Sequence, residues 1–189
     1  MILGYSRMLY AEVVTDEKSE TFLSCHRHAF SYFGGVTNEI LYDNAKVVAL
    51  KRDREGIVFN ESLLDFAGVH AFVPRVCRPY RPQTKGKVER AVRYIRDSFL
   101  EGETFSDLKH MQESLIAWLD NTANQRIHAT TKRRPVELLL DENLRDVRTI
   151  KLNTVLGFPD VRPETKRFTF EDAPVIPVRS LASYEEAAL

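Results

Sequence analysis

Residues 78–90 read Arg78-Pro79-Tyr80-Arg81-Pro82-Gln83-Thr84-Lys85-Gly86-Lys87-Val88-Glu89-Arg90, and this stretch decides how the rest of the chain is interpreted. Its two prolines, Pro79 and Pro82, fix the backbone and disfavour helix before Gln83. From Lys87 onward the apolar residues recur at helical spacing and predict one buried face, made of Val88, Ala91, Val92, Ile95 and Phe99. The stretch is therefore predicted to be a basic loop that opens a helix over residues 83–100.

Charged side chains form a stripe along this predicted helix. Lys85, Glu89, Arg93 and Arg96 lie three to four residues apart and so share one face. One interpretation is a solvated helix with ordinary ion pairs. The other is a carboxylate that holds a metal ion while its cationic neighbours hold phosphate, and the prolines, glycine and cations of the preceding loop favour it. From residue 75 to residue 97 the segment carries eight Lys or Arg and two acids, a net charge of +6 that is typical of a phosphate-binding groove.

Length and composition predict one domain with an appendage. The chain has 189 residues, 43% of them hydrophobic, and 27 basic and 27 acidic residues give zero net charge, so bulk charge does not indicate a nucleic-acid partner. Cys25 and Cys77 lack metal-ligand spacing and are expected to be reduced thiols. The run Cys25-His26-Arg27-His28 is discounted as a metal site, because a helix would direct its side chains to different sides. No apolar run reaches the length of a membrane span, and we expect a soluble intracellular protein without a signal peptide.

The first 45 residues predict strands, a helix and a strand that ends in an acid. Residues 2–6 and 8–14 are expected to be adjacent antiparallel strands or one bent ribbon. A helix capped by Thr15 or Asp16 should end at the glycine pair 34–35. Residues 39–42 then predict a buried strand with Asp43 at its carboxyl end, where ligands collect in open α/β sheets. A simple turn aspartate is the equally open alternative.

The remaining chain alternates short strands with helices. Residues 45–56 predict a short strand or a loose basic loop, Asn60 should cap a helix, and Pro74 marks residues 71–77 as an edge strand. A long helix is expected from a capping box at Thr104 and Asp107 to residue 122, and a short helix should begin at Pro135. Beyond residue 145, prolines recur and helical periodicity is lost. We therefore expect a core domain over residues 1–140 and a poorly defined C-terminal extension over residues 141–189.

Several segments together resemble a known family. They are Leu3-Gly4-Tyr5-Ser6-Arg7, residues 29–35, Tyr42-Asp43-Asn44, Cys77-Arg78-Pro79, residues 82–90, residues 94–100, Trp118-Leu119, Asn124 and Arg126. Over roughly residues 2–140 the chain resembles the integrase catalytic core of bacterial insertion-sequence transposases of the DDE class, and it is most similar to the IstA type. The resemblance implies an α/β fold that is ribonuclease-H-like and retroviral-integrase-like, with a mixed sheet flanked by helices.

The resemblance also implies a function and a site. It assigns Asp43 and Glu89 as the second and third catalytic acids, which would hold Mg²⁺ or Mn²⁺. The basic residues expected to bind DNA are Arg81, Lys85, Lys87, Arg90 and Arg93. The implied activity is DNA transposition, with metal-dependent cleavage of transposon ends and strand transfer to target DNA. The implied partners, beside DNA, are further copies of the chain and an IstB-type ATPase helper, and the implied location is the bacterial cytoplasm at the nucleoid.

The first catalytic acid is the point at which this sequence departs from the pattern. In the family it lies on a central first strand that precedes the Leu-Gly-Tyr-Ser-Arg segment, so we expect that strand and its aspartate to be missing and the chain to be N-terminally truncated. Glu12 is the stand-in considered for this acid. An incomplete ligand set predicts a core that is inactive alone, and whether the chain is an enzyme is left open. The alternative function is a non-catalytic DNA-binding or regulatory fragment that interferes with an intact transposase.

Overall fold

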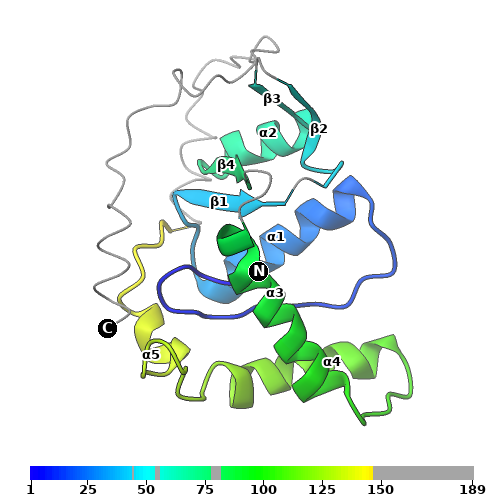
Figure 1. Ribbon diagram of the computed structural model, residues 1–189. Helices are drawn as coiled ribbons and strands as arrows, with labels where there is room; N and C mark the ends of the chain where they lie inside the picture. Colours follow the sequence, from blue (N-terminus) through cyan, green and yellow to red (C-terminus); the bar gives the residue numbers. More distant parts are fainter. Residues whose placement is uncertain (44, 54–55, 78–81, 147–189) are drawn as a thin grey trace.

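A computed structural model describes residues 1–43, 45–53, 56–77 and 82–146 of the 189-residue chain, with the backbone alone for residues 52–53 and 82–85 (Figure 1). The helices are α1 (Ser19–Phe33), α2 (Glu61–Val69), α3 (Pro82–Ile95), α4 (Leu108–Trp118) and α5 (Pro135–Leu139). Single π-helical turns extend α3 as η1 (Arg96–Leu100) and α4 as η2 (Leu119–Ala123). The strands are β1 (Glu39–Tyr42), β2 (Ala49–Asp53), β3 (Gly56–Phe59) and β4 (Val73–Val76).

The described strands form two small sheets. β1 pairs in parallel with β4, from Glu39 opposite Val73 to Tyr42 opposite Val76, while β2 and β3 form an antiparallel hairpin. The expected strands at 39–42 and 71–77 are thus confirmed. Residues 45–56 were expected to contain one short strand or a loop, and β2 confirms the strand. The second strand of the hairpin, β3, was not expected. The chain is a mixed α/β fold.

Residues 1–13 form a narrow hairpin, paired between residues 1–3 and 8–10, whose side chains pack into a hydrophobic cluster on each face. Backbone N–H groups of Leu3 and Tyr10 donate to the carbonyls of Met8 and Met1, each at 2.9 Å, which confirms antiparallel pairing. Successive side chains of an extended segment point to opposite faces. Met8 and Tyr10 accordingly pack with α1, whereas Leu9, together with Ala11 and Val13, packs with η1, α4 and η2.

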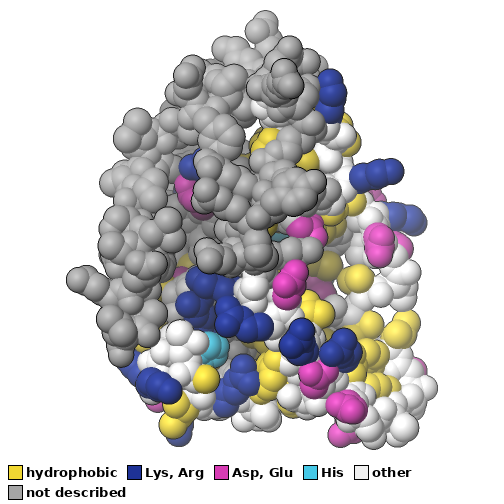
Figure 2. Space-filling view, in the orientation of Figure 1, with side chains coloured by type: hydrophobic (Ala, Val, Ile, Leu, Met, Phe, Trp, Pro, Cys, Tyr) yellow, Lys and Arg dark blue, Asp and Glu magenta, His cyan; other side chains and the backbone are white. Residues whose placement is uncertain are grey.

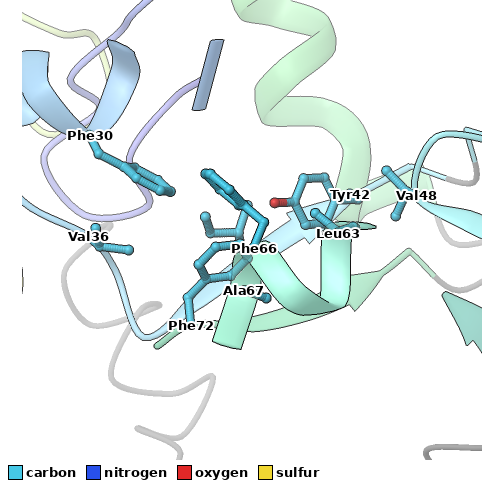
Figure 3. Close-up of a cluster of buried hydrophobic side chains, with 9 residues drawn as sticks. Phe30, Val36, Tyr42, Val48, Leu63, Phe66, Ala67 and Phe72 are labelled. Atoms are coloured by element: carbon cyan, nitrogen blue, oxygen red, sulfur yellow. The ribbon is translucent and has the colours of Figure 1, made fainter. Parts of the chain in front are cut away.

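The largest hydrophobic cluster lies between α1, α2 and the parallel pair of strands. It contains Phe30, Val36, Ile40, Tyr42, Val48, Leu63, Phe66, Ala67 and Phe72 (Figure 3). Its aromatic rings meet at centroid distances of about 6 Å, for example 6.1 Å between Phe30 and Phe66, a separation at which aromatic pairs attract. α1 joins this cluster to the hairpin, since its Ala29 and Phe33 belong to the second cluster.

Several helix ends follow local signals, with two corrections. The helix expected from a capping box at Thr104 and Asp107 begins only after Asp107, which is itself the N-cap. Gly34 ends α1 in the left-handed conformation (φ +76°), and Asn60 and Asp107 cap α2 and α4 by accepting from Ser62 and His110 N–H groups. The expected cap of α1 at Thr15 or Asp16 is wrong. The helix begins after Lys18, because Asp16 accepts instead from the Lys18 N–H at 3.0 Å and forms a turn before the helix.

The buried face of α3 matches the expected one in part. Ala91, Ile95 and Phe99 belong to the cluster that contains Leu9, Leu115, Leu119 and Ala123, as expected. Val88 and Val92 are 49% and 60% exposed, and Tyr94 packs against the cluster where they were expected to do so. Both sets of residues fit helical spacing, and only the position of α4 decides which one is covered. Figure 1 shows α3 running from the β1–β4 sheet to α4 at the lower end of the molecule.

Residues after α5 return to the core. Val36 and Arg145 exchange two backbone hydrogen bonds, each at 2.9 Å. The Ser6 N–H donates to the Glu142 carboxylate at 2.7 Å. Most of the C-terminal extension expected over residues 141–189 lies outside the described residues, which end at residue 146.

Candidate active site and basic pocket

Asp43 stands at the carboxyl end of the parallel pair of strands. It follows β1 directly and is exposed, and its Oδ1 accepts from the Ala45 N–H at 3.3 Å. The Cys77 N–H donates to the Tyr42 carbonyl at 2.9 Å, so β4 ends at the same level as β1. The two interpretations of Asp43 therefore coincide, since one residue is both a turn aspartate and a strand-end carboxylate.

A buried histidine fixes the residue that precedes Asp43. His26 on α1 is 5% exposed, and its Nδ1 lies 2.8 Å from the Phe22 carbonyl. Because a carbonyl only accepts, Nδ1 carries the proton and Nε2 accepts from the Tyr42 hydroxyl at 3.0 Å. Burial lowers the pKa of His26 and keeps it in this neutral form. This pair ties the end of β1 to α1 and so fixes the backbone that carries Asp43.

Glu89 lies on α3, two helical turns from its start at Pro82, and is exposed. The helix begins five residues after Cys77, so the chain passes directly from the end of β4 to the helix that bears Glu89. Among the described residues, no group of three or more His, Cys, Asp or Glu side chains is placed to hold a metal ion.

Glu12 does not complete a set with Asp43 and Glu89. Its Oε2 lies 2.9 Å from Nδ1 of His28, and it lines an open groove together with Asp16, Glu20 and His28. Glu12, which was considered as a stand-in for the first acid, therefore forms no three-ligand group with Asp43 and Glu89 among the described residues. The reason is local, because the alternation of the hairpin places Glu12 beside α1.

A second concave site gathers basic side chains from three separate segments. A pocket of about 320 Å³ is lined by Arg7 of the hairpin, Lys87 and Arg90 of α3, and Arg126 and His128 after η2. We call it the basic pocket. Its lining includes no Asp or Glu among the described residues. Figure 2 shows Lys and Arg side chains gathered around a histidine on this face.

Burial first, and then mutual repulsion, lower the pKa values of three groups in this pocket. Burial lowers the pKa of Arg7, the charge of Arg90 lowers it further, and Glu142 opposes both. Partial burial likewise lowers the pKa of Lys87, with Arg7 and Arg90 adding to the effect. Burial lowers the pKa of His128, followed by the charges of Arg126, Arg7 and Arg90. The pocket is therefore a region of concentrated positive potential.

The basic residues predicted to bind DNA divide between this pocket and its surroundings. Lys87 and Arg90 line it, whereas Arg93 is exposed elsewhere on α3. Arg81 lies outside the described residues, and so does the side chain of Lys85. Sequence reasoning did not select Arg7, Arg126 and His128 as site residues. The available signal was weak: Arg126 and His128 belong to a polar segment, and nothing local links them to Arg7.

A buried asparagine holds the hairpin against η2. Asn124 is 1% exposed. Its Oδ1 accepts from the Leu9 N–H and its Nδ2 donates to the Leu9 carbonyl, both at 2.9 Å. Nδ2 also lies 3.0 Å from the Tyr32 hydroxyl, which donates to Asp120 at 2.6 Å. Asn124 thus satisfies both backbone groups of Leu9 as a neighbouring strand would.

These features define a mixed α/β domain with a carboxylate at the end of a parallel strand pair, a second carboxylate on the helix that follows, and a basic pocket lined in part by that helix. Two family models described as "Integrase core domain" match residues 1–82 and 72–136. The chain belongs to this family, and it matches insertion-sequence transposases.

Two relatives illustrate the match. The chain is 43% identical over 143 residues to a putative transposase for insertion sequence element IS5376 from Geobacillus stearothermophilus, covering 76% of this chain and 36% of that protein. It is 35% identical over 134 residues to the transposase for insertion sequence element IS21 from Pseudomonas aeruginosa, covering 70% and 34%. The chain therefore spans about a third of the length of these curated relatives. No helix among the described residues is long and apolar enough to span a membrane.

Proposed function

We propose that this chain is a DNA-handling core of an insertion-sequence transposase, with a ribonuclease-H-like fold and Asp43 and Glu89 as its metal-binding carboxylates. The observation that carries the proposal is Asp43 at the carboxyl end of parallel β1 and β4, in a chain that belongs to the integrase core family. The reaction proposed for the intact protein is metal-dependent cleavage of DNA and transfer of the resulting 3′ end to a target strand.

The two carboxylates suit a hard divalent cation. Mg²⁺ in proteins is commonly bound by one or two carboxylates and completes its shell with waters and substrate phosphates, and Mn²⁺ takes the same oxygen ligands. Asp43 and Glu89 are both exposed to solvent, from which a cation and substrate would approach. When bound, the cation would neutralise charge that develops on the phosphate during displacement. Tyr42 and His26 hold the strand end in place for Asp43.

The basic residues of the loop and α3 would bind the DNA backbone. Arg81, Lys85, Lys87, Arg90 and Arg93 are the proposed contacts, and each neutralised phosphate contributes affinity that weakens with salt. These contacts carry no sequence information by themselves. Self-association and binding of an IstB-type ATPase helper belong to the same proposal and rest on the family resemblance.

Strand-transfer assays test the enzymatic part of the proposal. The chain would be incubated with labelled duplex DNA, supercoiled plasmid and Mg²⁺ or Mn²⁺, and nicked and joined products would be counted. Asp43→Asn and Glu89→Gln should each lower product formation at least tenfold. Asp65→Asn, which removes an exposed acid from α2, should leave it unchanged. Strand transfer in the wild type that Asp43→Asn leaves undiminished would reject the assignment of Asp43. No product in the wild type above Asp43→Asn would reject catalysis by this chain alone.

A second candidate function is non-catalytic DNA binding that interferes with an intact transposase. The absence of any three-ligand group among the described residues favours it, because paired-metal chemistry needs a fuller ligand set than two carboxylates. Under this function the wild type shows metal-independent DNA binding and no product above Asp43→Asn. Addition of the chain to an active relative should then reduce that relative's strand transfer.

A further inference from the structure

We propose that the basic pocket binds a phosphate group of the DNA backbone, with Arg7, Arg126 and His128 as contacts in addition to Lys87 and Arg90. The inference rests on the proposed function only for the source of the phosphate, since the recognition chemistry is contained in the pocket itself. It gives the hairpin and the segment after η2 a role in DNA binding.

The position of Arg7 indicates a ligand rather than a structural role. Its Nη1 nitrogen is buried and has no hydrogen-bond partner among the residues that the structure describes. A buried donor without a partner is costly, and a bound anion would supply one. The Arg7 backbone lies in the left-handed region (φ +64°), a conformation uncommon for a residue with a side chain. Bonds on either side maintain it: Ser6 N–H to Glu142 at 2.7 Å, and Met8 N–H to Ser6 Oγ at 3.2 Å.

Arg126 is held flat over an aromatic ring. Its guanidinium carbon lies 3.4 Å from the centroid of the Tyr94 ring, and both residues line the pocket. Stacking of this kind orients the planar donor fork while its N–H groups stay available at the edges. A pre-oriented fork suits phosphate, which accepts two parallel hydrogen bonds from one guanidinium.

His128 is fixed in the tautomer that donates from Nε2. The Thr130 N–H donates to its Nδ1 at 3.2 Å, so Nδ1 carries no proton. Burial and the charges of Arg126, Arg7 and Arg90 lower its pKa, which favours the neutral ring. A neutral imidazole with a fixed Nε2–H is a hydrogen-bond donor to an anion without adding to the repulsion among the four cations.

The positive charge of the basic pocket also favours an anionic ligand. Arg7, Lys87, Arg90 and Arg126 bring four formal positive charges to one concave site, and Glu142 offsets part of that charge near Arg7 and Lys87. The Lys87 Nζ donates to the Gly4 carbonyl at 3.4 Å, and the Arg90 Nε donates to the Gly86 carbonyl at 2.8 Å. These bonds hold both side chains against the pocket wall and leave further N–H groups for a ligand. The pocket volume suits a phosphodiester with its neighbouring sugar atoms rather than a folded partner.

DNA affinity of the full 189-residue chain tests the proposal in the absence of metal. Binding to a fluorescein-labelled duplex of arbitrary sequence would be followed by anisotropy in EDTA over a series of salt concentrations. Arg7→Gln and Arg126→Gln should each weaken binding about tenfold and lower the salt slope by about one, as expected for one lost phosphate contact. Lys109→Gln removes the same charge from an exposed residue of α4 that pairs with Glu113, and it should cost less than twofold. Equal losses in pocket and control variants would overturn the proposal, and melting temperatures would verify that each variant is folded.

A titration with inorganic phosphate tests whether the pocket binds a phosphate group, independently of whether DNA supplies that group. At constant pH and ionic strength, phosphate should shift the ring protons of His128 in NMR spectra, with His128→Gln providing the assignment, and Arg126→Gln should abolish the shift. A shift combined with unchanged DNA affinity in Arg126→Gln would overturn DNA as the source. Absence of any shift would overturn the pocket. Because metal and strand transfer are not involved, failure of the Asp43 assays leaves both results interpretable.

Discussion

Replacement of Asn124 by leucine should destabilise the fold more than any exposed substitution nearby. Leucine has the same branched arrangement of four side-chain heavy atoms but cannot bond Leu9, so the variant leaves one buried backbone N–H and one buried carbonyl without partners. Each orphaned group costs about 1–3 kcal/mol, and the free energy of unfolding should fall by about 2–5 kcal/mol. For a domain of this size, that corresponds to a melting temperature lower by roughly 5–15 °C.

Urea unfolding followed by circular dichroism would measure the effect, with Asn121→Leu as the matched control. Asn121 lies one turn earlier and is exposed, and its side chain donates only to the Ala117 carbonyl at 2.8 Å, so its replacement should change stability by less than about 0.5 kcal/mol. A loss of stability below about 1 kcal/mol in Asn124→Leu, or equal losses in both variants, would refute the conclusion that Asn124 substitutes for a neighbouring strand.

Three further predictions concern the core. Tyr42→Phe should lower the free energy of unfolding by about 1–3 kcal/mol in urea titrations because it leaves buried His26 Nε2 unpaired, while exposed Tyr5→Phe should have no measurable effect. Burial lowers the pKa of His26 below its ordinary 6.5, so on acidification the unfolded chain binds a proton before the folded chain does. The free energy of unfolding should therefore fall as the pH drops below about 6.5. In His26→Leu this dependence on pH should have a shallower slope. Gly35→Ala should lower the free energy of unfolding by about 1–3 kcal/mol, because its Cβ would lie 2.8 Å from the Arg145 carbonyl oxygen. In the control Gly68→Ala the new Cβ meets no described atom within 4 Å, so this variant should slightly stabilise α2. Thermal melts would measure both.

The buried hydrogen bonds of Asn124 and Tyr42 connect the stability of the fold to the proposed chemistry. Tyr42 immediately precedes Asp43, and Leu9 lies two residues after Arg7, so each buried bond positions a proposed functional residue through the backbone. Variants at Tyr42 or Asn124 should therefore weaken function as well as stability. Comparison with variants of Asp43 and Arg7 themselves would separate the two effects, because those side chains can be replaced without loss of the buried bonds.

Local signals in the sequence were sufficient for much of the fold. The αL glycine at position 34, the Asn60 cap and the first-turn proline of α5 each act within a few residues, and the structure contains all three. The incorrect predictions concern the start of α1 and the buried face of α3, where the sequence is compatible with two local arrangements. Asp16 forms a turn instead of a cap, and α3 buries Tyr94 beside the expected Ala91 and Ile95 while it leaves Val88 and Val92 exposed.

By itself the sequence determined the family, the strand that ends in Asp43 and the basic helix that carries Glu89, because these depend on motif identity and short-range periodicity. Only the tertiary structure decided that Glu12 pairs with His28, away from the proposed acids, and that Arg7, Lys87, Arg90, Arg126 and His128 share one pocket. The physical reason is chain separation. Arg7 and Arg126 lie more than one hundred residues apart, and they meet because Asn124 bonds both backbone groups of Leu9 and so sets the hairpin against η2. No periodicity along the chain encodes such a contact.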